Sequence, residues 1–72
     1  MNLLFTLLLL AGMEGWSVEA ISDYELIIIN NMAHSITCYI YYEDGGFLKR
    51  LVQAGSESRP FSRDGLEGVE CY

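Results

Sequence analysis

The residues of this sequence that could carry out chemistry are few: one histidine, two cysteines and ten acidic residues among 72. His34 and Cys38 are four residues apart and could act as a base and a nucleophile, but only if Cys38 is a free thiol. A metal site needs three or four suitable ligands, which one histidine and two cysteines do not supply. Glu43 and Asp44 are adjacent acids of a kind typical of a solvated turn. We therefore predict no catalytic residue, no metal and no cofactor, and expect a protein that is not an enzyme.

The N-terminal residues predict the compartment in which the protein acts. Residues 3–10 are almost uniformly apolar, and Val18 and Ala20 stand three and one residues before the Ala20–Ile21 bond. This pattern is typical of a secretory signal peptide spanning residues 1–20 and cleaved between Ala20 and Ile21. Cleavage after Ser17 and an N-terminal helix of an intracellular protein are the alternatives.

The predicted signal peptide implies a secreted, extracellular protein with one small domain at residues 21–72. The apolar run is shorter than the roughly 20 residues that a membrane-spanning helix needs, so we expect no integral membrane anchor. The formal net charge of the whole chain is −6. An acidic chain lacks the basic patch that nucleic acids and anionic membranes require, so we expect neither as a partner.

Cys38 and Cys71 both lie in the predicted mature domain, where an oxidising compartment favours a disulfide between them. Closing a loop of this length stabilises a fold by about 3–4 kcal/mol in the chain-entropy model. A disulfide between two copies is the alternative, and we expect a monomer rather than such a linked dimer.

The elements that must position these residues are predicted to be short β-strands. β-branched and aromatic residues are concentrated at residues 24–30, 35–42 and 47–52, and residues 57–62 form a fourth candidate whose Pro60 restricts it to a sheet edge. Three consecutive isoleucines favour a central position for the first of these strands. The third also matches helical spacing, but its flanking glycines favour a strand.

Turn residues separate these strands. We predict hairpin turns at residues 30–34, 44–46 and 54–56, a loop at 63–68 and a short tail at 69–72. The fold class that follows is all-β: a small antiparallel meander or sandwich of three to five strands, after an N-terminal signal helix.

Tyrosines suggest where a partner would bind. In the predicted strand at residues 35–42, strict alternation places Thr37, Tyr39 and Tyr41 on the face opposite Cys38. Tyrosine is enriched at protein interfaces because its ring buries area while its hydroxyl forms hydrogen bonds. These three residues are the predicted partner-binding surface, with the filling of a second sandwich layer as the alternative.

The layout resembles a known family. Cys38 lies just inside a predicted strand, in Cys38-Tyr39-Ile40-Tyr41-Tyr42, and Cys71 follows some thirty residues later. A signal peptide, a short domain of strands and two cysteines at this separation are similar to the small secreted β-sandwich effectors of plant-pathogenic fungi, the group related to the Magnaporthe avirulence proteins and the ToxB toxin. The resemblance implies a host-directed effector or toxin-like virulence factor that acts by binding a protein.

Two other functions are compatible with the sequence. Lys49-Arg50 is a dibasic step at which a convertase could cut, so the chain could be the precursor of a secreted signalling or venom peptide. A structural fragment of a longer gene product is the third alternative.

Overall fold

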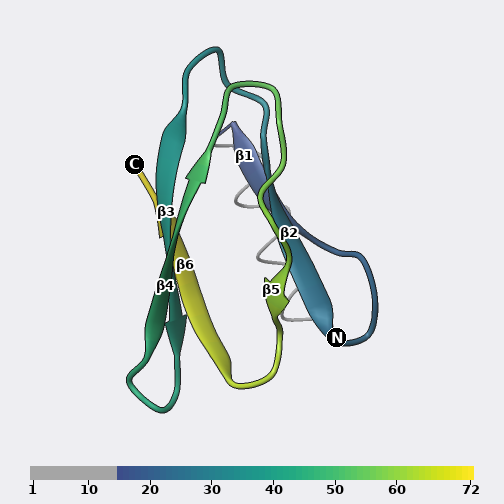
Figure 1. Ribbon diagram of the computed structural model, residues 1–72, viewed down its shortest axis with the longest axis vertical. Coiled ribbons are helices and arrows are strands. Elements are labelled where there is room, and N and C mark those ends of the chain that lie inside the picture. The colour runs from purple at the N-terminus through teal and green to yellow at the C-terminus, as the bar shows by residue number, and fades with distance from the viewer. Residues whose placement is uncertain (1–14) are drawn as a thin grey trace.

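The computed structural model describes residues 15–72, which form six β-strands and no helix. The strands are β1 (Trp16–Ala20), β2 (Glu25–Asn30), β3 (Ile36–Tyr42), β4 (Phe47–Val52), β5 (Phe61–Ser62) and β6 (Leu66–Cys71). They form two three-stranded antiparallel sheets: sheet A with the order β1-β2-β5, and sheet B with the order β4-β3-β6 (Figure 1). The all-β class predicted from the sequence is confirmed, with two sheets packed together and two more strands, β1 and β6, than the sequence indicated.

The core between the two sheets is built by alternating apolar residues. Sheet A contributes Val18 from β1 and Leu26 and Ile28 from β2, all at most 1% exposed. Sheet B contributes Ile36, Cys38 and Ile40 of β3 together with Val52 of β4, and Phe61 of β5 completes the cluster. Because successive side chains of a strand point to opposite faces, burial of these positions commits their neighbours to the outside of each sheet.

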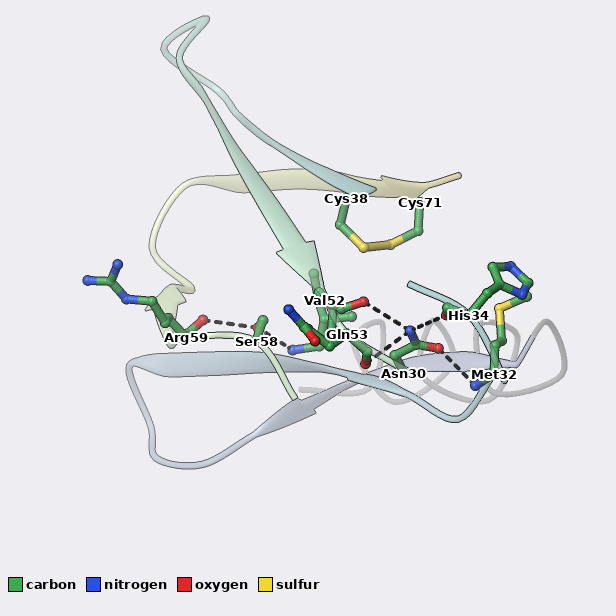
Figure 2. Close-up of a disulfide and its surroundings, with 10 residues drawn as sticks. Asn30, Met32, His34, Cys38, Val52, Gln53, Ser58, Arg59 and Cys71 are labelled. Atoms are coloured by element: carbon green, nitrogen blue, oxygen red, sulfur yellow. Dashed lines mark hydrogen bonds between the residues drawn. A yellow bond between two sulfur atoms is a disulfide. The ribbon is translucent and has the colours of Figure 1, made fainter. Parts of the chain in front are cut away.

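The predicted disulfide is confirmed and joins the two adjacent strands β3 and β6. Cys38 and Cys71 are directly opposite each other in the register, and Cys38 is fully buried (Figure 2). The bond therefore closes the 33-residue separation inside the core and attaches the C-terminal strand to the centre of sheet B.

Asn30, the last residue of β2, is a polar residue with 0% of its surface exposed. Its Nδ2 donates to the carbonyl oxygens of His34, Val52 and Gln53 at 2.9–3.2 Å, and its Oδ1 accepts from the amide of Met32 at 2.8 Å (Figure 2). One side chain thus joins the end of β2, the following loop and the end of β4.

This network corrects the predicted hairpin at residues 30–34. β2 and β3 lie in different sheets, so the segment is a crossover and not a hairpin turn. The connection between β4 and β5, which contains the predicted hairpin at 54–56, also crosses between the sheets. Only the predicted hairpin at 44–46 joins paired strands, where Gly45 has φ +90° and Gly46 donates to the Asp44 side chain.

The predicted strand at 57–62 is reduced to an isolated bridge and two residues. Glu57 bridges Ile29, and β5 pairs only with Glu25 and Leu26 of β2. Between them the Ser58 hydroxyl accepts a hydrogen bond from the amide of Ile28 at 2.9 Å, while its own amide donates to the Ile28 carbonyl. A side chain therefore satisfies part of the ladder that a regular strand would supply.

The two ends of the described chain depart from the predictions. Residues 63–68 were predicted as a loop and 69–72 as a tail, but Leu66–Cys71 form β6, which pairs with β3 along its length. The apolar run at residues 3–10 lies outside the described residues. The residues just before the predicted cleavage site are among the described ones. Trp16–Ala20 form β1, which pairs with β2, and Val18 lies in the core. Cleavage after Ala20 or Ser17 would remove all or part of this strand, and cleavage itself stays a prediction.

Candidate functional site: an aromatic face on sheet B

The candidate site is the outer face of sheet B, which carries the residues predicted to bind a partner. Alternation along β3 buries Ile36, Cys38 and Ile40 and turns the residues between them outward. The structure thus places Thr37, Tyr39 and Tyr41 on the solvent side of the sheet and not between the two sheets. Their role in binding stays a prediction.

The strand register extends this face over three strands. Tyr41 lies between Phe47 and Gly68, Tyr39 between Lys49 and Glu70, and Thr37 beside Leu51. Tyr72 adjoins Thr37 through two backbone hydrogen bonds of 2.8 and 2.9 Å. We call these nine residues the aromatic face. They form three rows across β4, β3 and β6, the third of which ends on the residue after β6: Phe47, Tyr41 and Gly68; Lys49, Tyr39 and Glu70; and Leu51, Thr37 and Tyr72.

The aromatic rings of this face contact one another across the strands. The ring of Tyr39 lies 6.2 Å from that of Phe47 and 6.2 Å from that of Tyr72, and the ring of Tyr41 lies 6.3 Å from that of Phe47. Edge-to-face and tilted pairs at such distances stabilise each other's orientation. The rings are therefore held in place while much of the surface of Phe47 and Tyr72 remains free, at 58% and 74% exposed. The neighbouring Leu51 is 65% exposed.

Two opposite charges flank the central tyrosine of the aromatic face. Lys49 and Glu70 are the residues paired with Tyr39 on its two sides, and both side chains are exposed. The Tyr72 hydroxyl donates to the Glu70 carboxylate at 2.8 Å, and this hydrogen bond, followed by the carboxylate charge, raises the pKa of Tyr72. Desolvation by neighbouring side chains, and then the same carboxylate, raises the pKa of Tyr41.

Replacing Glu70 by Gln is expected to lower the pKa of both Tyr72 and Tyr41 toward the ordinary value. In the native protein both phenols stay protonated to higher pH than in the unfolded chain, so their contribution to stability is present below pH 10 and is lost as the pH rises through the folded-state pKa. An NMR titration of labelled tyrosines measures each phenol separately. Unchanged pKa values at Tyr41 and Tyr72 would contradict the assignment.

Some residues of the aromatic face were not singled out in the sequence. Phe47, Leu51 and Tyr72 join it only through the pairing of β4 and β6 with β3. Alternation of Phe47, Lys49 and Leu51 was a usable signal, because these positions share one face of a strand. Nothing local to Tyr72 indicated that it would lie beside Tyr39.

The other reactive residues are not arranged for chemistry. Cys38 is oxidised in the disulfide. His34 lies in an exposed loop, where its backbone carbonyl oxygen accepts a hydrogen bond from the Asn30 side chain. Glu43 and Asp44 are exposed at the hairpin. Within residues 15–72 no cluster of three or more His, Cys, Asp or Glu side chains could hold a metal ion.

The dibasic step lies inside a paired strand. Lys49 and Arg50 are in the middle of β4, and Arg50 is opposite Cys38, with its Nε buried and lacking a hydrogen-bond partner. A protease would need to detach β4 from β3 to reach this bond. The structure therefore adds no support for cleavage at this step.

An open groove lies between the β1–β2 connection and the β5–β6 turn. It is lined by Asp23, Tyr24, Ser62, Arg63, Asp64 and Gly65. The Arg63 guanidinium donates to the Asp23 carbonyl at 3.3 Å, and the backbone amide of Arg63 donates to the Tyr24 carbonyl at 2.9 Å. These bonds connect the two segments, which is a structural role.

Comparison with protein-family models, curated proteins and solved structures found no match to this chain. Residues 15–72 form a small all-β protein of two three-stranded antiparallel sheets with one disulfide. In the described part of the chain, no helix has the length and apolar character needed to span a membrane.

Proposed function

We propose that this chain is a secreted, non-enzymatic protein that acts by binding another protein through the aromatic face of sheet B. The observation that carries the proposal is the exposure of Phe47, Leu51 and Tyr72 on one face of sheet B beside Tyr39 and Tyr41. Contiguous exposed apolar surface of this kind marks interaction sites in small soluble proteins.

The composition of the aromatic face supports a protein as the partner. Aromatic side chains that are already held by their neighbours lose little conformational entropy on binding. Tyrosine and tryptophan are also enriched among the residues that contribute most of the binding energy at protein interfaces. The acidic chain, with net charge −6, does not favour nucleic acid. The apolar residues 3–10 and the buried disulfide support secretion. On the resemblance described above, the partner of such a protein is a host protein, and its role is that of an effector or toxin-like factor.

Replacing Tyr39 and Tyr41 together by Ser is expected to weaken partner binding by about tenfold or more, because buried tyrosines are typical binding hot spots. Wild-type and variant proteins are immobilised in equal amounts and exposed to an extract of the target tissue, and the proteins recovered by each are quantified. The affinity of the recovered protein is then measured with purified components.

Tyr24→Ser is the matched control, since Tyr24 is 77% exposed and lies outside the aromatic face. It should bind as the wild type does. The Tyr39/Tyr41 variant must keep its circular dichroism spectrum and its disulfide. Equal binding by both variants, or loss of the fold in the double variant, would remove the support for this proposal.

A further inference from the structure

We infer that the aromatic face binds a second copy of this chain, in a symmetric face-to-face dimer with its two-fold axis parallel to the strands. This inference rests on the proposed function in that it treats the aromatic face as a protein interface. It adds the identity of one occupant, argued from the charges and shape of the face itself.

The charges of the middle row are self-complementary. Lys49 of β4 and Glu70 of β6 lie on opposite sides of Tyr39. Two strand spacings, about 10 Å, separate their backbones within one copy, with Tyr39 between them, and the Glu70 carboxylate accepts the Tyr72 hydroxyl. A two-fold axis along the strands places β4 of one copy over β6 of the other. Each Lys49 then faces the Glu70 of the second copy, giving two identical ion pairs.

The alternative symmetric arrangement is unfavourable. A two-fold axis across the strands would place Lys49 over Lys49 and Glu70 over Glu70. Like charges opposed across an interface cost several kcal/mol, so the charges select the first arrangement.

The shape of the aromatic face agrees with the same axis. Phe47 and Gly68 are at the two ends of the row centred on Tyr41, so the axis along the strands places each Phe47 over the Gly68 of the second copy. A Cβ built on Gly68 meets nothing within 4 Å, and its φ is not positive, so neither packing nor backbone within one chain requires glycine there. The missing side chain leaves room for the Phe47 ring. In the third row, the same axis places Leu51 of each copy over Tyr72 of the other.

The interface is small, which sets the expected affinity. Three strands about 4.8 Å apart and about five residues long present a few hundred Å² per copy. Standard interfaces bury about 800 Å² per partner. We therefore expect a reversible dimer with a dissociation constant in the micromolar range or weaker. Such a dimer covers the aromatic face at high concentration and releases it to another partner on dilution.

Charge reversal tests the arrangement in solution. Sedimentation equilibrium over a wide concentration range should show a monomer–dimer equilibrium for the native protein. Lys49→Glu alone and Glu70→Lys alone should each weaken dimerisation by about tenfold or more. An equimolar mixture of these two variants should restore it, because each copy then supplies the charge that the other requires. Glu25→Lys, at an exposed position of β2 in sheet A, makes the same change in net charge as Glu70→Lys and should leave dimerisation unchanged.

The outcomes separate this inference from the proposed function. A native protein that is monomeric at all concentrations, or single variants that dimerise as the wild type does, would overturn the inference, even if the Tyr39/Tyr41 variant loses an external partner. A dimer that survives denaturant and separates with reductant would also overturn it. Restored association in the mixture would support the inference, whether or not an external partner binds.

Discussion

A chain that begins at Ile21 is expected not to fold cooperatively, whereas a chain that begins at Gly15 is expected to fold. Removing β1 takes away the strand that pairs with β2 over five residues, and it removes Val18, which is 1% exposed in the core. Burial of one such side chain contributes about 1.5–3 kcal/mol. A domain of this size has only a few kcal/mol of stability in total, at about 0.05–0.15 kcal/mol per residue.

Thermal unfolding followed by circular dichroism, together with the dispersion of amide NMR signals, distinguishes the two chains. The same strand is tested without truncation by Val18→Asp, which should be strongly destabilising, against Ala20→Asp at an exposed position of β1. A well-folded chain beginning at Ile21 would contradict this prediction and would make the cleavage site after Ala20 compatible with a stable product. Sequencing the N-terminus of the secreted protein would then show which product the cell makes.

Replacing Asn30 by Asp is expected to destabilise the protein by about 3–5 kcal/mol at neutral pH, because it leaves a buried charge uncompensated. The change removes the Nδ2 donor from three carbonyl oxygens and places a carboxylate against them, in a site with no exposure to solvent. Only the acceptor bond from the Met32 amide could remain.

The pH dependence of that variant has a defined sign. Burial against carbonyl oxygens would raise the pKa of the introduced carboxyl above its unfolded value of about 3.9. The destabilisation should therefore develop as the pH rises above about 4 and should diminish in acid. Asn31→Asp makes the same chemical change at the adjacent, exposed residue and should cost little. Urea unfolding at several pH values measures both, and equal effects of the two variants would contradict the role assigned to Asn30.

The aromatic face illustrates how a small sheet can combine a core with a surface for binding. Alternation along β3 gives its inward residues to the core and its outward tyrosines to solvent. The disulfide holds β6 against β3, so the position of Tyr72 beside Tyr39 depends on a bond on the opposite face of the same sheet. Reduction of this bond should therefore loosen the aromatic face as well as the fold.

Features that depend on residues close together in the chain could be predicted before the fold was known. Alternation in residues 36–42 assigned Ile36, Cys38 and Ile40 to the core, and the Asp-Gly-Gly turn joined β3 to β4. With two cysteines in the chain, one intramolecular disulfide was available, and it is the one observed. These signals either lie within a short stretch of the chain or follow from the number of cysteines.

The pairing of the strands follows from packing across the whole domain and could not be predicted locally. The residues of β1 resemble a cleavage region and those of β6 a loop with glycine and acids, and each becomes a strand because a distant strand satisfies its backbone hydrogen bonds. The turn residues at 30–34 indicate a reversal of the chain, but the hydrogen bonds of buried Asn30 to His34, Val52 and Gln53 hold it as a crossover between sheets. Pairing between segments far apart in sequence depends on packing energies that no short stretch of residues contains, which is why Phe47, Leu51 and Tyr72 joined the candidate site only in the folded protein.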